Sequence, residues 1–352
     1  MTARGQQWQA GRPALSTSIS LTDPHRFLAL VAPTALLPQA CADPHAAIGF
    51  SGGQVRAAVV AAVVACASLL WMAGLTIDPF ARSNIPYYSV LAMAPLLRLG
   101  CLRDGRHWSI VLAQLVEYYT LFMAMALVGA ISSYPIAAMS QGFADAGLQR
   151  VDELLQFDWL AWYRLVAAHR TLQLLGIAAY QSIFLTPALL LGWFAVTGQR
   201  REAHRFLAAF AIAAALTLAI YSQMPAVGPF SYLWRGPIPY MPVSELWQPD
   251  LIPALRAHML TVIDVGQLRG LVSAPSFHAA SATLYIAAAR RCGPLRWWLT
   301  AMPCAMLLST PVEGTHYLID LLLGAGVALV AWYFAALLMR WRVRTAHSRE
   351  SQ

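Results

Sequence analysis

Long apolar runs with almost no charge recur along this sequence, and they determine the solvent in which it can fold. From Ala57 onward they lie near residues 57–77, 85–98, 108–132, 171–197, 206–223, 276–290, 295–311 and 316–340. A helix needs about 20 apolar residues to cross the hydrocarbon of a bilayer. Helices and closed barrels are the structures that satisfy backbone hydrogen bonds in lipid. We therefore predict an all-α polytopic membrane helical bundle.

The composition also favours a membrane protein over a soluble one. Hydrophobic residues make up 59% of the chain and charged residues 11%, whereas soluble domains carry about a quarter charged residues. These values exclude a cytosolic globular protein, a disordered chain and a disulfide scaffold. The formal charge is +8, and all 24 basic residues are arginine. We explain this excess by membrane topology and expect no nucleic-acid partner.

The cysteines do not form a metal-binding or redox motif. They number five and lack C-x-x-C spacing: Cys41, Cys66, Cys101, Cys292 and Cys304. Several lie inside apolar runs, so we expect them to be small buried hydrophobic side chains.

We predict four regions along the chain: an irregular N-terminal segment (1–55), extra N-terminal membrane helices (56–104), the main membrane domain (105–340) and a basic cytoplasmic tail (341–352). The apolar stretch at 27–37 is too short to span a bilayer and resembles part of a signal peptide, so its role stays open. Two long segments separate helices of the main domain. Residues 133–170 include an amphipathic stretch at 151–168, and residues 224–275 are rich in Pro and Trp.

Arginine placement orients the predicted helices, because cytoplasmic loops retain excess positive charge. The basic connectors and the tail share this property: Arg98, Arg103 and Arg106; Arg200, Arg201 and Arg205; Arg290, Arg291 and Arg296; and Arg340, Arg342, Arg344 and Arg349. An even number of predicted helices separates each group from the next, so all four can be cytoplasmic. The helix starts near 276 and 316 then face outward, toward the periplasm if the membrane is a bacterial inner membrane.

Two local patterns lie at these outward helix starts. In the first, Pro275 and Ser276 precede His278; Pro suits the first turn of a helix, and Ser satisfies free backbone donors there. The amides and the positive dipole end of such a helix favour anions. In the second, His316 and Asp320 are four residues apart and share one helix face. A carboxylate beside an imidazole fixes its tautomer and stabilises its cation.

These patterns resemble the type 2 phosphatidic acid phosphatase superfamily. Its second motif, Pro-Ser-Gly-His, matches at Pro275, Ser276 and His278, with Phe277 in place of Gly. Its third motif is a Ser-Arg pair followed after five residues by His and then, after three more, by Asp. Ser309, His316 and Asp320 match it at the same spacing, but Thr310 replaces the Arg. The lysine-containing first motif is not found.

Further local similarities resemble a sub-branch of this superfamily, the fungal inositol phosphorylceramide synthases and their bacterial relatives. They lie at 158–159, 225–228, 275–280 and 314–320, and the resemblance covers roughly residues 105–340. It implies a six-helix acid phosphatase-like core preceded by one or two extra N-terminal helices.

The resemblance also implies roles for individual residues. His316 is expected to be the nucleophile, Asp320 to hold it and His278 to act as general acid, through a phosphohistidine intermediate. A lipid phosphate or phospholipid is the expected donor, with a lipid alcohol or water as acceptor, and no cofactor or metal is implied. Three alternatives stay open: a lipid phosphate or polyprenyl diphosphate phosphatase, a metal site formed by the same three residues, and a noncatalytic transporter or scaffold.

Positive groups must also surround a transferring phosphoryl group. Arg269 is our first choice for this role, with Arg256 and then Arg235 from the same segment, and Ser276 and the helix-start amides are expected to contribute.

Several other polar and small residues stand out. Glu117 lies within an apolar run and either has a function or bonds to a neighbouring helix. We expect Asp152, Glu153 and Asp158 on the solvated face of the amphipathic stretch, with Asp158 in reach of a lipid headgroup. We interpret Gly324 and Gly326 as sites of close helix packing.

Overall fold

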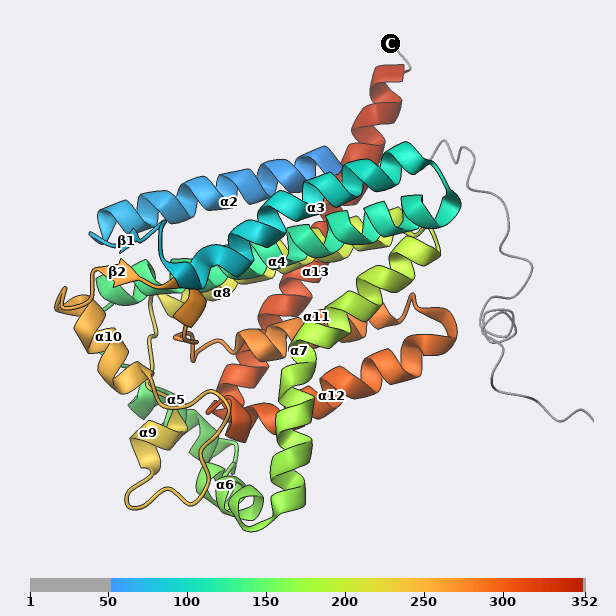
Figure 1. Ribbon diagram of the computed structural model, residues 1–352. Helices are drawn as coiled ribbons and strands as arrows, with labels where there is room; N and C mark the ends of the chain where they lie inside the picture. The colour runs from blue at the N-terminus through green and yellow to red at the C-terminus, as the bar shows by residue number, and fades with distance from the viewer. Residues whose placement is uncertain (1–51, 351–352) are drawn as a thin grey trace, which may run out of the picture. The chain divides into compact units, whose positions relative to one another are not determined.

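The structure is a computed structural model that describes residues 52–350, with side chains from 53 to 339. Eight long helices coincide with the eight apolar runs: α2 (Gly52–Met72), α3 (Ile85–Asp104), α4 (His107–Met139), α7 (Arg170–Val196), α8 (Arg200–Tyr221), α11 (Phe277–Ala289), α12 (Arg296–Glu313) and α13 (Leu318–Glu350) (Figure 1). The prediction of an all-α helical bundle is confirmed.

Shorter elements connect these helices. They are α5 (Asp145–Leu154), α6 (Trp159–Ala168), α9 (Pro229–Leu233) and α10 (Gln248–Arg256), the 3-10 turns η3 (Arg82–Asn84), η4 (Val265–Gln267) and η5 (Gly293–Leu295), and the strands β1 (Thr76–Ile77) and β2 (Val262–Ile263). β1 and β2 form one short parallel pair. This pair joins the N-terminal helices to the segment between α8 and α11.

Six described helices are long and apolar enough to cross a membrane: Gly53–Met72, Arg82–Asp104, His107–Met139, Arg170–Val196, Arg200–Tyr221 and Leu318–Met339. α11 is a shorter apolar helix, and α12 is not among the six. The apolar runs therefore located all eight helices, but α11 and α12 are not long and apolar enough to count as membrane-crossing helices.

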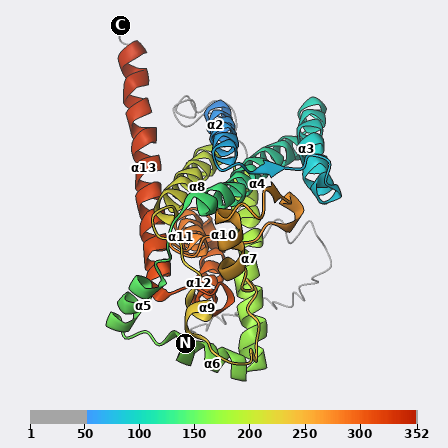
Figure 2. The ribbon, with the colours of Figure 1, turned by 90° about the vertical axis from the view of Figure 1, so that its left-hand side faces the viewer.

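Several helix boundaries differ from our predictions. α2 ends at Met72, because Gly74 adopts φ 64° and turns the chain into β1. α4 continues through Pro135 to Met139, and α13 is helical through Glu350, beyond the predicted helix end near residue 340 (Figure 2). The amphipathic stretch 151–168 is divided between α5 and α6, because Asp158 caps the start of α6 by accepting from Ala161 N at 2.9 Å. The start of α2 also lies within the segment predicted to be irregular, whose residues 1–51 lie outside the described part.

α8 lies at the centre of the core. Phe206, Leu207, Phe210 and Ala213 on this helix are all buried, and the Phe210 ring lies 4.6 Å from the Phe122 ring of α4. α8 also contacts α2, α11 and α13, while α7 packs along α12. The central helix thus positions α11 and α13 relative to each other.

Cysteine burial matches the prediction only in part. Cys66 and Cys292 are buried, Cys101 is partly buried and Cys304 is exposed on the outer face of α12. All four are free, and Cys41 lies outside the described residues. The burial prediction is wrong for Cys304, because an apolar residue in a membrane helix need not face the protein core.

Glu117 has a structural role in this fold. Its carboxylate on α4 accepts from the guanidinium of Arg56 on α2 and from that of Arg98 on α3, the latter at 2.8 and 3.1 Å. Its side chain is only 14% exposed. Glu117 therefore bonds to neighbouring helices, which was one of the two interpretations left open.

We expect Glu117→Gln to loosen α2 and α3 from α4, because a neutral amide cannot form two ion pairs. The free energy of unfolding should fall by about 2 kcal/mol, the order of magnitude of hydrogen bonds to a charged group. The measurement is thermal unfolding of purified protein in detergent. Glu153→Gln, which removes an exposed carboxylate of α5, is the control. Equal unfolding temperatures for the Glu117 variant and the parent protein would contradict this role.

Candidate active site

The candidate site lies where α11 and α13 begin. The Ser276 side chain accepts from Ala279 N at 3.3 Å and caps α11. The Ser276 amide donates to the Asp320 carbonyl oxygen at 2.9 Å, which ties the start of α11 to the first turn of α13. The predicted helix start at Pro275-Ser276 is therefore present.

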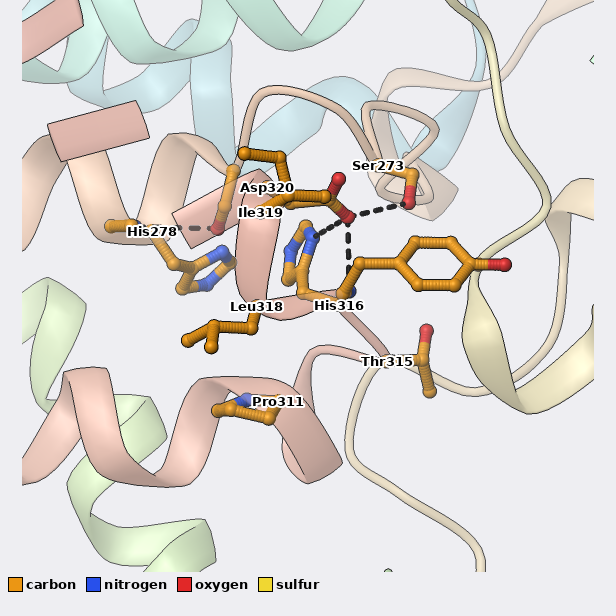
Figure 3. Close-up of polar contacts among 12 residues, drawn as sticks. Ser273, His278, Pro311, Thr315, His316, Leu318, Ile319 and Asp320 are labelled. Atoms are coloured by element: carbon orange, nitrogen blue, oxygen red, sulfur yellow. Dashed lines mark hydrogen bonds and ion pairs between the residues drawn. The ribbon is translucent and has the colours of Figure 1, made fainter. Parts of the chain in front are cut away.

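His316 and Asp320 form a buried pair. His316 Nδ1 lies 3.4 Å from Asp320 Oδ2, longer than a typical hydrogen bond of about 2.9 Å. Asp320 is completely buried, and the same Oδ2 accepts from Tyr317 N at 3.1 Å and from Ser273 Oγ at 3.4 Å (Figure 3). The carboxylate is thus fixed from several sides and faces the imidazole.

His278 lies beside His316, with 6.4 Å between the ring centroids (Figure 3). Its ring stacks on Tyr180 of α7 at 4.2 Å with an interplanar angle of 16°. The Tyr180 hydroxyl also lies 3.3 Å from His278 Nδ1. The structure therefore brings the two predicted imidazoles together and adds Tyr180, which sequence reasoning missed.

Two aspartates of α5 hold the loop that carries His316. Asp152 accepts from Leu318 N at 2.8 Å and Ile319 N at 2.9 Å, so it caps α13 from another helix. Asp145 accepts from Val227 N and Gly228 N, each at 3.0 Å. The expectation that Asp152 is solvated is wrong, because its carboxylate is completely buried by this cap. Burial raises the pKa of Asp152, and the two amide bonds partly offset this rise.

Glu153 and Asp158, in contrast, are exposed as expected.

Tyr317 links Asp145 to the loop that carries His316. Its hydroxyl donates to Asp145 Oδ1 at 3.0 Å; burial and the nearby carboxylate raise its pKa, so it stays a donor. Gly228, at φ 88°, lies against the same loop, and a Cβ there would be 2.7 Å from Thr315 O. The segment 225–228 therefore supports the His316 loop by direct backbone contact.

Glu313 lies three residues before His316 and is buried. The Tyr240 hydroxyl contacts its two carboxylate oxygens at 2.7 and 2.8 Å, and Val243 N donates to it at 3.2 Å. A Cβ at Gly176 of α7 would lie 2.8 Å from Glu313 Oε1. Glu313 therefore joins the segment between α9 and α10 to the last turn of α12.

The predicted phosphate-binding arginines lie in different places. Arg269 lines a cavity of about 310 Å³ together with His278; its guanidinium lies 4.1 Å from the Trp247 ring and 3.8 Å from Glu245. Arg256 donates to Ser140 Oγ at 2.9 Å and Gly142 O at 2.8 Å, which ties α10 to the end of α4.

Other candidates from the sequence motifs bond within their own segments. Arg235 donates to the backbone oxygens of Ser231 and Trp234. Thr310, where the family has Arg, donates to Met306 O at 2.6 Å. Ser276 is completely buried at its cap position. Arg269 is thus the candidate cation that shares a cavity with His278.

The described residues contain no group of three or more His, Cys, Asp or Glu side chains arranged to hold a metal ion. The three residues of the site therefore do not form a metal-ligand group in this structure.

The chain belongs to the PAP2 superfamily, whose model matches residues 146–334, just over half of the 352 residues. The match begins in α5 and ends in α13, so it includes both histidines and Asp320. A search of curated proteins and a search of solved structures found no match. The protein is a phosphatase or phosphotransferase of the type 2 phosphatidic acid phosphatase superfamily and an integral membrane protein.

The residues that sequence reasoning missed left only a weak signal. Asp145, Leu148 and Asp152 are all buried, and their spacing of three and four places them on one helix face. Acidic residues on the same face as a buried leucine indicate a carboxylate with an internal partner. Tyr180 carries no such signal, because it lies in an ordinary apolar run.

We expect Asp152→Asn to reduce turnover by about tenfold or more, because small displacements of a reacting group are costly. An amide retains one acceptor oxygen but turns an NH₂ toward the backbone donors of α13. The measurement is phosphate release from a lipid phosphate in detergent micelles. The control is Glu153→Gln on the neighbouring exposed position, which should retain full turnover. Equal activity of both variants would exclude the cap as a determinant of the site.

We expect Gly324→Ala to separate α11 from α13, because a Cβ there would lie 2.2 Å from Ser276 O. Overpacking of this kind costs about 1–3 kcal/mol. The matched control is Gly326→Ala, since a Cβ at Gly326 meets nothing within 4 Å. Thermal unfolding and turnover should both decrease in the first variant only. The close-packing interpretation thus holds for Gly324 and not for Gly326.

Proposed function

We propose that this protein is a lipid phosphotransferase that works through a phosphohistidine intermediate, in the manner of an inositol phosphorylceramide synthase. The observation that carries the proposal is the proximity of two imidazoles, at 6.4 Å between centroids, with a buried carboxylate behind one of them. An imidazole held by a carboxylate serves as a nucleophile, and a second imidazole serves as acid and then base.

The proposed reaction has two balanced steps. His316 attacks the phosphorus of the donor lipid, the bond from phosphorus to the leaving alcohol oxygen breaks, and His278 gives that oxygen a proton. An acceptor hydroxyl then attacks phosphorus, the bond to the His316 nitrogen breaks, and His278 takes the acceptor proton. Asp320 stabilises the imidazolium character that develops on His316. Arg269 is the proposed partner of the phosphate charge, because it lines the cavity that His278 also lines.

We also propose that the site faces the noncytoplasmic side, the periplasm of a bacterial inner membrane. The arginine-rich turns between α3 and α4, α7 and α8, and α11 and α12 lie on one side of the bundle, at the right in Figure 1. His278 lies in the first turn of α11, at the opposite end of this helix from the arginine-rich turn between α11 and α12. Positive charge marks the cytoplasmic side of a membrane protein, so this arrangement supports an outward site.

A liposome assay separates transfer from hydrolysis. Purified protein receives phosphatidic acid in one reaction, and phosphatidylinositol with ceramide or diacylglycerol in another. Transfer gives a new phospholipid, which supports the proposal, whereas free phosphate as the only product identifies a lipid phosphate phosphatase of the same superfamily. No product from any donor lipid would overturn the proposal.

We expect His316→Ala to abolish turnover. Asp320→Asn should retain roughly a thousandth or less of the parent turnover, as when a triad aspartate is neutralised. The phosphohistidine is trapped by denaturation in alkaline detergent after brief exposure to phosphorus-labelled lipid. The parent protein should carry a label that is stable to base and labile to acid, and the His316 variant should carry none. Full activity in the His316 variant would remove the proposed nucleophile.

A further inference from the structure

The cavity beside His278 has a mostly apolar lining with a few polar side chains. Its volume is about 310 Å³, and Arg269 and His278 contribute its charged or titratable side chains. The remaining lining comes from α4, α7 and α8 and the segment before α11, and it includes Met125, Phe184 and Leu218. A ligand with a charged group and a hydrocarbon body matches this composition.

Thr217 of α8 lines the same cavity and is only 2% exposed. Its Oγ1 has no hydrogen-bond partner among the residues that the structure describes. A threonine in a helix ordinarily bonds to a carbonyl of the preceding turn, as Thr186 of α7 does to Ser182 O at 2.8 Å. A buried polar group without a partner is costly, so a hydrogen bond with a ligand group in this cavity would stabilise the hydroxyl.

We propose that Thr217 is a specificity residue that donates a hydrogen bond to a carbonyl in the lipid backbone. The inference rests on the proposed function, because it takes this cavity as the place of a donor lipid whose phosphate lies at His278. Acyl glycerolipids and sphingolipids carry an ester or amide carbonyl a few bonds from the phosphate, whereas dialkyl lipids and polyprenyl phosphates do not. The hydroxyl therefore favours the first group and leaves an unpaired polar atom against the second.

The polar group adds selectivity that hydrocarbon contact cannot supply. A bilayer is as apolar as the cavity wall, so burial of a lipid chain gives little preference for one lipid over another. A site that bonds a polar substrate group rejects an analogue that lacks it, because the buried partner is then unpaired. One neutral hydrogen bond corresponds to a preference of about three- to tenfold.

The test compares two lipids of equal chain length that differ only in their ester carbonyls: diacyl phosphatidic acid, which has them, and its dialkyl ether analogue, which does not. We expect kcat/KM of the parent protein to favour the diacyl lipid by about three- to tenfold. Thr217→Val, which removes the hydroxyl at nearly constant shape, should bring the ratio close to one, and Thr217→Ser should retain it. The matched control is Thr186→Val, a buried threonine already bonded within its helix, which should also retain the ratio.

Because the readout is a ratio within one protein, a general loss of activity does not change it. An unchanged ratio in Thr217→Val, or no preference in the parent protein, would overturn the inference. Failure of the proposed function is recognised separately, as absence of a new phospholipid from any donor lipid in the liposome assay. In that case lipid-induced thermal stabilisation of the full chain still measures the preference: equal stabilisation by both lipids overturns the role of Thr217, and loss of a diacyl preference in Thr217→Val supports it.

Discussion

The hydrogen bond from the Ser276 amide to the Asp320 carbonyl oxygen sets the separation of the two helices that carry the site. Gly324 stands one turn further along α13 and lets the helices approach until a Cβ would collide with Ser276 O. His278 follows Ser276 by two residues, and His316 precedes Asp320 by four. The distance between the two imidazoles is therefore a property of the α11–α13 contact, and the central helix α8 holds that contact from behind.

Buried carboxylates then fix the loop that joins α12 to α13. Asp152 and Asp145 accept from backbone amides, and Glu313 accepts from Tyr240 and Val243. A carboxylate taken out of water is destabilising unless hydrogen bonds satisfy its oxygens, and bonds between amides and an ionised group are among the stronger ones. These hydrogen bonds hold the loop in place, while Tyr180 of α7 stacks on the His278 ring and fixes its orientation.

Much of the fold follows from the sequence because lipid is a demanding solvent. Apolar runs located all eight long helices, and Pro275-Ser276 located the start of α11. The boundaries were less predictable: α4 continues through Pro135, since membrane helices tolerate proline when neighbouring groups compensate. Within the site, the motif spacing placed His278, His316 and Asp320 together. It did not find Asp152, because an acidic residue on an amphipathic helix resembles a solvated one until its partner in a distant segment is known.

The hydrogen bonds between Tyr240 and Glu313 connect two parts of the chain that lie far apart in the sequence. Glu313 lies in the last turn of α12, three residues before His316, while Tyr240 lies in the segment between α9 and α10. Displacement of that segment would remove the hydrogen-bond donors of the buried Glu313 side chain and disturb the backbone that leads into His316. The position of the segment between α9 and α10 is therefore coupled to the position of the His316 backbone.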